Sequence, residues 1–545
     1  MFSSVCCADI AYKVIHAVGN DVGMAVQLQS DQNIYMLERS ELDPLLHTGT
    51  APSSKPYRYL AMHSNGTVLQ QEPEFREPAS TTLHEFYGRK RTLFDETVDQ
   101  PIPMFGDPID RLDTSAVHPG YEIPTIHVRA PDDDLKELYE NYLEDFAITA
   151  NMSHITATDM QQYEDVKFEL SGQTSRLFPK FSFNFHLGKD DNLGGYRKFK
   201  LRACATDPSF MREKLYYDVL EAAGLPASRA SYVRLFINNE PHGLYLLVDN
   251  YKNPFLKNTF GKGEKKYKHG MLVQGNMPEN PMAPEALRHG ANLEYRGPEP
   301  DNYKVGNASL YKLQQEASKD DSGLEKFIDF LKFVNEQGAA AGKDEWERRF
   351  NVDMFLKNMA LEVLMGHVDG YLGAAHNYFV YHDPGSGRFT WMSADLDQTM
   401  GNTMVPLASN TSLDRFALLE HEANRPLFHQ IMLVPEFKSR YEEILQIMHG
   451  SLYANSALSR RTQFLEDMIR DDVEWDASLN RIRSSATVAE KHRDQLQQKV
   501  LQLPLGPDFL SRIGAIDFDA ALRGPINDHP SIMPLQDWLS QTSQA

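Results

Sequence analysis

Four polar residues between positions 369 and 397 have the types and the order that phosphoryl transfer requires. Asp369 stands in the stretch His-Val-Asp-Gly, Asn377 follows it, and Asp395 and Asp397 close the segment. A loop carboxylate can take the proton of an attacking hydroxyl, and an amide oxygen and a second carboxylate can bind a divalent metal. Protein kinases use Asp, Asn and Asp in this order. The segment predicts Asp369 as the base and Asn377 and Asp395 as metal ligands, with Asp397 sharing the metal or ordering the loop.

Periodicity and turn signals in the sequence predict the helix and the strands around these residues. Apolar residues recur with helical spacing from Val352 to Leu364, and Gly366 follows as a stop signal. An aromatic run at 378–381 and a second at 389–392 flank the turn sequence Asp-Pro-Gly-Ser-Gly. We therefore expect Asp369 on a loop after a buried helix, and Asn377 and Asp395 at the two ends of a hairpin.

Candidate phosphate-binding residues lie upstream. A strand at 166–170, a Gly/Ser turn and a return strand led by Lys180 would form a hairpin that cradles phosphates, although an ordinary exposed hairpin has the same pattern. The next strand, 199–202, carries Lys200 and Arg202 on one face. We expect Lys180, assisted by Lys200 or Arg202, to contact the phosphates of ATP.

A helix follows, with Asp207 expected as its N-cap and Gly224 just past its end. Arg212 falls at the centre of the apolar arc of this helix, so it needs a partner, either carboxylates or nucleotide phosphates. Glu213 lies at the rim of the arc. It is expected to position Lys180 or Lys200, as the helix glutamate of kinases positions a lysine, or else to form a rim salt bridge.

As a set, these motifs resemble the CotH family of atypical protein kinases, known from bacterial spore coats, and especially the CotH-like surface and invasin proteins of mucoralean fungi. The resemblance covers residues 8 to 450. The segments that carry it are Phe199 to Arg202, Asp207 to Leu215, Val233 to Tyr251 around Gly243-Leu244-Tyr245, Asp369 to Tyr381, and Asp395 to Asp397.

The resemblance and the local patterns together predict an α+β fold, with a two-lobed, atypical kinase-like catalytic region behind a small β-sandwich domain. Period-two strands and turns indicate an immunoglobulin-like β-module over residues 8–95, followed by a proline-rich linker at 96–130. A strand-rich N-lobe is expected at 131–251. Its last residues, Asp249 to Tyr251, would form a hinge near the adenine.

The remaining residues, 252–525, are expected to form a helical C-lobe that carries the Asp369, Asn377 and Asp395 site. Its helices are predicted from the periodicity of 323–337, 426–433, 436–451, 457–472 and 487–503, the last opened by a Thr-x-x-Glu capping box.

Composition excludes some partners. The 545 residues carry 55 Lys plus Arg against 76 Asp plus Glu, and the net charge of −21 opposes binding to nucleic acid. Only three cysteines occur, so a disulfide framework is not expected. No apolar run is long enough to span a bilayer, and residues 1–8 do not read as a signal peptide. The resemblance nevertheless implies a secreted or surface protein, and sequons at Asn65, Asn151, Asn307 and Asn410 permit glycosylation.

The first functional hypothesis is transfer of the γ-phosphoryl group of ATP, with Mg²⁺ or Mn²⁺, to Ser or Thr of a spore or cell-wall protein. A second hypothesis is a surface adhesin that binds a host-cell receptor and uses the kinase core as a scaffold. A third is a metal-dependent phosphohydrolase, since several carboxylates also suit two-metal chemistry. Kinase activity is favoured because the motifs occur together and in order.

Overall fold

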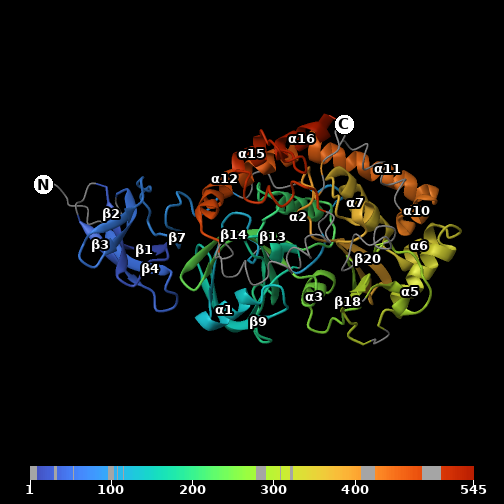
Figure 1. The fold of residues 1–545 in the computed structure, drawn as a ribbon, viewed down its shortest axis with the longest axis horizontal. Coiled ribbons are helices and arrows are strands. Elements are labelled where there is room, and N and C mark those ends of the chain that lie inside the picture. The colour runs from blue at the N-terminus through green and yellow to red at the C-terminus, as the bar shows by residue number, and fades with distance from the viewer. Residues whose placement is uncertain are drawn as a thin grey trace.

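The computed structural model describes residues 9–29, 33–52, 55–95, 103–106, 109–113, 116–172, 174–277, 290–306, 308–319, 323–404, 406, 424–481 and 505–544. These residues form a mixed structure of helices and several separate sheets. In Figure 1 the chain runs from a small β-module at one end, through a central barrel, to a part rich in helices at the other end. The α+β class predicted from the sequence is confirmed.

The β-module is a sheet of seven strands in the order β6-β5-β2-β3-β4-β1-β7. Alternate residues of the strands fill its core, as the period-two pattern predicts, and Tyr12 of β1 packs against Tyr57 of β5 at 4.9 Å between ring centroids. The strands are β1 Asp9–Ile15, β2 Val22–Leu28, β3 Ile34–Arg39, β4 Leu46–Pro52, β5 Tyr57–His63, β6 Val68–Gln71 and β7 Glu85–Phe86.

Buried contacts join the β-module to the rest of the chain. The carboxylate of Asp43 lies 2.9 Å from Nδ1 of His127, and both side chains are fully buried. Phe86 packs against Phe236 and against Trp475 of helix α12 (Ala457–Ser478), with ring centroids 6.2 and 5.6 Å apart. The module is therefore docked on the rest of the chain by both a buried Asp–His pair and an aromatic contact.

The central unit is a closed barrel of seven strands in the order β10-β11-β12-β14-β13-β8-β9. Aromatic residues fill it, and Phe168 stacks on Phe183 and Phe185 on Phe199. Helix α1 (Asp132–Glu140) contacts β9. The strands are β8 Thr125–Arg129, β9 Ala147–Ile155, β10 Met160–Leu170, β11 Phe183–His186, β12 Lys198–Arg202, β13 Ala230–Ile237 and β14 Glu240–Asp249.

One row of side chains lies on the outer face of the barrel. Glu169, Asn184, Lys200 and Val248 are paired in register across β10, β11, β12 and β14. Because side chains alternate between the two faces of a strand, this row points away from the phenylalanine core. The barrel thus presents a polar stripe, made of Glu169, Asn184 and Lys200, to the part of the molecule that is rich in helices. This part is called the helical half below.

Helix α2 runs from Arg212 to Ala222, so the predicted N-cap at Asp207 was placed one turn too early. Residues 207–210 form a turn that ends at Phe210, where φ is 59°. The Asp207 carboxylate still satisfies the first turn, since it accepts hydrogen bonds from the backbone N–H groups of Ser209 (3.0 Å) and Arg212 (2.9 Å).

The helical half is built around a four-stranded sheet, β18-β15-β19-β20. The predicted hairpin is confirmed, since Tyr378 pairs with Ser393 and Asp383 with Arg388. Its strands are β15 Leu272–Gly275, β18 Tyr311–Gln315, β19 Tyr378–Asp383 and β20 Arg388–Ser393. Smaller elements nearby are α3 Phe255–Phe260, η2 Pro300–Tyr303, β16 Lys304–Val305 and β17 Ala308–Ser309.

Helices make up much of this half; two of them contact strand β20 of the sheet, whereas α12 contacts β14 of the barrel. In Figure 1 several of them lie along the upper edge of the molecule. The helices are α5 Glu325–Lys332, the π-turn η3 Phe333–Gln337, α6 Lys343–Arg349, α7 Val352–Leu364, α8 Tyr371–Ala374, α10 Pro426–Met432, α11 Pro435–His449, the π-turn η4 Gly450–Ala454, α12, α15 Phe518–Arg523 and α16 Leu535–Gln544. The helices predicted from residue 352 and from 426 to 472 are confirmed. The helix predicted at 487–503 lies outside the described residues. Within the described ranges, no helix is both long enough and apolar enough to cross a membrane.

Candidate active site

The loop that carries Asp369 is held in place by Glu362 of helix α7. After this helix the chain turns at Gly366, where φ is 61°. The Glu362 carboxylate accepts hydrogen bonds from the backbone N–H groups of Tyr371 (3.0 Å) and Leu372 (2.7 Å). Burial raises the pKa of this carboxyl group to about 7. Glu362 therefore fixes the backbone directly after Asp369.

Two neighbours orient the carboxylate of Asp369. Nδ2 of Asn377 donates a hydrogen bond to Oδ2 at 2.7 Å, and Nε2 of His376 lies 2.8 Å from Oδ1. The pair formed by Oδ1 and Nε2 is buried and lacks regular hydrogen-bond geometry. Burial alone would lower the pKa of His376, but the adjacent Asp369 raises it above its ordinary value. The carboxylate of Asp369 therefore favours the protonated form of His376.

Asn377 and Asp395 meet at the open end of the β19–β20 hairpin. The backbone N–H of Ala394 donates to the carbonyl of Asn377 at 2.9 Å. This hydrogen bond places Asn377 and Asp395 on neighbouring segments of the backbone. Both have positive φ values, 59° for Asn377 and 55° for Asp395. Asn and Asp tolerate this conformation better than other residues with a Cβ, so the two residue types suit the backbone as well as the chemistry.

Arg202 joins three carboxylates in one cluster. Its guanidinium group lies 2.6 Å from Glu213, 2.5 Å from Asp395 and 3.1 Å from Asp397. Burial raises the pKa of Glu213 to about 7, against the influence of Arg202. Burial acts in the same direction on Asp395, but there the cations Arg202 and Lys200 prevail and lower the pKa. Asp395 is thus a carboxylate in the folded protein.

Lys200 stands beside this cluster without a direct ion pair. No hydrogen bond or salt bridge joins its ammonium group to any described residue. Burial and the neighbouring Arg202 lower its pKa, while Asp395 and Glu213 act in the opposite direction. An ammonium group with unused donors in a partly buried place is available to an anionic ligand.

A cleft of about 750 Å³ brings these groups together. Its lining includes the polar stripe of the barrel and the residues Arg202, Glu213, Asp369, Asn377 and Asp395. Asp395 exposes 42% of its side chain despite its ion pair, so it faces the open space. This volume lies within the range of cofactor and ligand sites in proteins.

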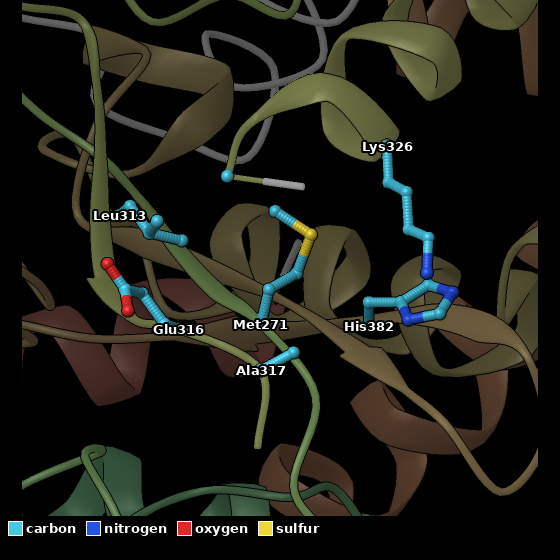
Figure 2. A pocket seen from close by; sticks show the side chains of 7 residues that line it. Met271, Leu313, Glu316, Ala317, Lys326 and His382 are labelled. Carbon is cyan, nitrogen blue, oxygen red and sulfur yellow. The ribbon is translucent and has the colours of Figure 1, made fainter. Parts of the chain in front are cut away.

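A second hollow is too small to compete with the cleft. It lies among Met271, Leu313, Ala317, Lys326 and His382, and Figure 2 shows the side chains of Lys326 and His382 approaching one another at its side. Its volume is about 10 Å³, which is room for one water molecule.

Comparison with known proteins places the chain in a family. A model of the CotH family, described as "CotH kinase protein", matches residues 168–502, which is more than half of the chain. The chain belongs to the CotH family. The matched range contains Lys200, Arg202, Asp369, Asn377 and Asp395.

The CotH relatives include fungal and bacterial proteins. Invasin CotH3 of Rhizopus delemar is 26% identical over 482 residues, which cover 87% of this chain and 76% of that protein. Spore coat protein homolog 1 of the same fungus is 25% identical, over 87% of this chain and 73% of the relative. Inner spore coat protein H of Bacillus subtilis is 23% identical, over 63% of this chain and 86% of the relative.

The donor atoms of the cleft suit a divalent metal bound with a nucleotide. Asp395, Asp397 and Asn377 offer carboxylate and amide oxygens, which are the ligands that Mg²⁺ and Mn²⁺ prefer. Among the residues that the structure describes, no three His, Cys, Asp or Glu side chains are grouped as a metal cage. Magnesium is commonly held by one or two carboxylates plus phosphate oxygens and water, so this donor set fits it.

The structure does not bring Lys180 to the cleft. Its ammonium group lies 2.6 Å from the carboxylate of Asp476 and 4.3 Å from the ring centroid of Tyr245, at the mouth of the barrel. Lys180 precedes β11, whereas the polar stripe uses Asn184 on the same strand. Of the two lysines, Lys200 lines the cleft and Lys180 does not.

Arg212 is likewise absent from the cleft. It is fully buried, lies 2.7 Å from Asp207, and donates to the carbonyl groups of Met400 (3.2 Å) and Met533 (2.7 Å). The partner that the sequence required is thus a carboxylate of the protein and not a phosphate. Glu213 similarly pairs with Arg202 in place of Lys180 or Lys200.

Sequence reasoning missed three residues that shape the site. His376 directly precedes Asn377, and this adjacency was a usable signal, although the interval from Asp369 looked only like a widened spacing. Glu362 reads as one polar residue on an apolar helix, which could have marked it as a buried group with a local partner. Thr206, which donates to Asp397, gave no signal.

Proposed function

We propose that the chain is an atypical protein kinase that transfers the γ-phosphoryl group of ATP to Ser or Thr hydroxyls of another protein. The observation that carries this proposal is the meeting of Asp369, Asn377, Asp395 and Lys200 in one cleft between the barrel and the helical half. In this proposal the barrel half and the helical half act as the two lobes of a kinase-like catalytic region.

Asp369 would accept the proton of the acceptor hydroxyl as that oxygen attacks phosphorus. Asn377 orients one carboxylate oxygen by its 2.7 Å hydrogen bond, and His376 lies 2.8 Å from the other. Because Glu362 holds the following backbone, the carboxylate needs little reorganisation before it acts. The proton would end on Asp369 and the phosphoryl group on the acceptor oxygen, while the bond between the γ-phosphorus and the β–γ bridging oxygen breaks and ADP leaves with its electron pair.

Asp395, Asn377 and Asp397 would hold Mg²⁺ or Mn²⁺. When bound, the metal neutralises phosphate charge and orients the transferred group. Lys200 and Arg202 would contact phosphate oxygens, and Glu213 would orient Arg202 through their 2.6 Å ion pair. The pairing of a helix glutamate with a strand cation follows the logic of the Lys–Glu pair of kinases, with Arg202 in place of the lysine.

The deciding experiment incubates purified protein with γ-labelled ATP, Mg²⁺ or Mn²⁺ and a serine-rich acceptor protein. Wild type should label the acceptor, and Asp369→Ala should lower the rate by about 10²–10⁴-fold with little change in ATP affinity. Asp145→Asn, which changes an exposed carboxyl group at the rim of the cleft, is the matched control. Release of phosphate without acceptor labelling would instead identify a phosphohydrolase.

A second candidate function is adhesion at a cell surface, because three of the matching relatives from Rhizopus delemar are named invasins. In that case the chain would be a secreted or spore-surface protein that binds a host-cell receptor, and the cleft would be a scaffold. Wild type and Asp369→Ala would then both fail to label an acceptor and would bind cells equally.

A further inference from the structure

A second row of side chains crosses the outer face of the barrel, beside the polar stripe. Lys167 of β10 is paired with His186 of β11, and His186 is paired with Lys198 of β12. Each of these positions lies two residues from the polar stripe along its own strand, so the two rows share one face of the sheet. Two residues span about 7 Å along a strand. The second row therefore places two lysines next to the stripe that contains Lys200.

Two further lysines extend this row across the cleft. Lys252 follows the end of β14, and Lys312 lies on β18 in the helical half. Together with Lys167 they line the cleft that contains the proposed reacting groups. The four residues of this lysine cluster are Lys167, Lys198, Lys252 and Lys312. Because they belong to both halves of the molecule, a ligand of the cluster would touch both sides of the cleft.

The protein balances only part of the charge of the lysine cluster. The carboxylate of Glu169 lies 2.6 Å from the ammonium group of Lys167. No hydrogen bond or ion pair joins the ammonium groups of Lys198, Lys252 and Lys312 to a residue within the described ranges. Burial lowers the pKa of Lys252, and the nearby cations Lys312 and Lys167 lower it further, against the influence of Glu169. The ammonium groups are therefore close enough to repel one another.

Such a cluster is unusual for a chain whose net charge is −21. Like charges that lie close together cost stability, and an anionic partner removes this cost. Each ammonium group also has three N–H donors for carboxylate or phosphate oxygens. A nucleic acid would face the whole acidic surface of the chain, whereas a short acidic segment of a protein would meet only the rim of the cleft. The charges therefore favour an acidic peptide segment as the ligand.

The lysine cluster lies at a defined distance from the proposed reacting groups. Arg202, which pairs with Asp395, is the last residue of β12, and Lys198 is the first. The two side chains share one face of the strand, about 13 Å apart along it. An extended acceptor segment covers this distance in about four residues. A segment that runs from the reacting groups toward the start of β12 thus brings its neighbouring side chains to the lysines.

We propose that the lysine cluster binds an acidic segment of the acceptor protein, with carboxylates about four residues from the Ser or Thr that receives the phosphoryl group. The role of this segment as part of an acceptor rests on the proposed kinase function, but its binding requires no catalysis. Ion pairs with Lys252 and Lys312 hold the segment across the cleft. The preferred substrates are therefore acidic proteins.

Two synthetic peptides test this inference, each with one serine between flanking runs of either glutamate or glutamine. Fluorescence anisotropy with the full chain measures binding without ATP, and γ-labelled ATP with Mg²⁺ measures labelling. The glutamate peptide should bind about ten-fold more tightly and be labelled with a correspondingly higher kcat/KM. Added salt should reduce the difference, because it screens exposed ion pairs. Equal binding of the two peptides would overturn the proposal. Tighter binding of the glutamate peptide without labelling of either would support the acidic-segment site and contradict the kinase function instead.

Charge-reversed variants locate the site. The double variant Lys252→Glu and Lys312→Glu should lose the preference for the glutamate peptide, with little change in ATP affinity by calorimetric titration. The double variant Lys136→Glu and Lys438→Glu has the same net charge, at exposed positions of α1 and α11, and should behave as wild type. Lys252→Gln with Lys312→Gln replaces the reversal if circular dichroism shows that the first variant is unfolded. An unchanged preference in a folded variant would place the peptide elsewhere, and lost ATP affinity would assign the lysines to the nucleotide. Either result would overturn the proposal.

Discussion

Arg202 and Arg212 are close in sequence, and each lies against carboxylates, yet their surroundings differ. Arg212 is fully enclosed, and its donors reach Asp207 and two backbone carbonyl groups. Arg202 faces three carboxylates at the wall of an open cleft, next to Lys200, which has no direct partner. The first arrangement is complete, whereas the second has acceptors and donors to spare.

The difference separates structural charges from functional ones. A closed network such as that of Arg212 or Lys180 has its charges matched within the protein, so a ligand has nothing to add. The cleft concentrates carboxylates with shifted pKa values around unpaired donors, which is the pattern of ligand and catalytic sites. Burial alone therefore does not distinguish the site from a structural network of charges. Incomplete pairing of the charged groups does.

The largest expected effect tests the closed network of Arg212. Arg212→Met should lower the free energy of unfolding by about 3–5 kcal/mol, because Asp207 would remain buried without its counter-charge. Urea unfolding followed by circular dichroism measures it. Arg348→Met, at an exposed arginine of α6, should change stability little. Normal stability with lost ATP affinity in Arg212→Met would instead make Arg212 a nucleotide ligand.

The next effect tests the open cleft around Arg202. Mg²⁺-ATP should stabilise wild type by about 2.7 kcal/mol at a concentration of 100 times its Kd, because only the folded state presents the site. Asp395→Asn should lose most of this gain, since the amide keeps the shape and removes the charge. Thermal unfolding with and without Mg²⁺-ATP measures both proteins. Equal shifts would exclude Asp395 as a metal ligand.

A pair of lysine variants compares the two sides directly. Lys200→Met should weaken ATP binding about ten-fold, which is about 1.4 kcal/mol, because a phosphate contact is lost. Lys180→Met should leave ATP affinity unchanged and lower stability, since its partner Asp476 is buried. Calorimetric titration of ATP into each variant gives the affinities. The reverse pattern would restore the role that the sequence predicts for Lys180.

Local patterns in the sequence predicted the framework of the site well. The hairpin at 378–393 and helix α7 depend on periodicity and turn residues within a short window, and both have the expected extent. Consequently the positions of Asp369, Asn377 and Asp395 on a loop and at hairpin ends were accessible. Their meeting follows from register, because Asn377 and Asp395 directly flank the paired strands.

The same reasoning could not predict contacts between residues that are far apart in the sequence. Lys180 is paired with Asp476, almost 300 residues away, and Arg212 reaches Met533, more than 300 residues away. Periodicity around either cation shows that it is buried but not which partner it meets. Alternation along β12 already separates Lys200 from Phe199 and Leu201, but only the closed barrel shows that the face with Lys200 is its outside.

A further effect concerns pH and Glu362, the buried carboxyl group beneath the Asp369 loop. Its pKa is raised from 4.5 to about 7 by burial, so between these values the folded state holds a proton that the unfolded state has released. The stability contributed by this group is thus complete below pH 4.5 and is lost as pH rises through 7. The slope is at most about 1.4 kcal/mol per pH unit.

Glu362→Gln removes this titration while keeping one acceptor for the loop N–H groups. Its stability relative to wild type should therefore be lower at pH 5 than at pH 8, and Glu137→Gln, at an exposed position of α1, should show no such dependence. Urea unfolding at both pH values gives the difference. A wild type whose advantage grows toward pH 8 would mean that Glu362 is ionised in the folded protein and binds the loop as a carboxylate. The group beneath the base would then belong with the charged cleft and not with the closed networks.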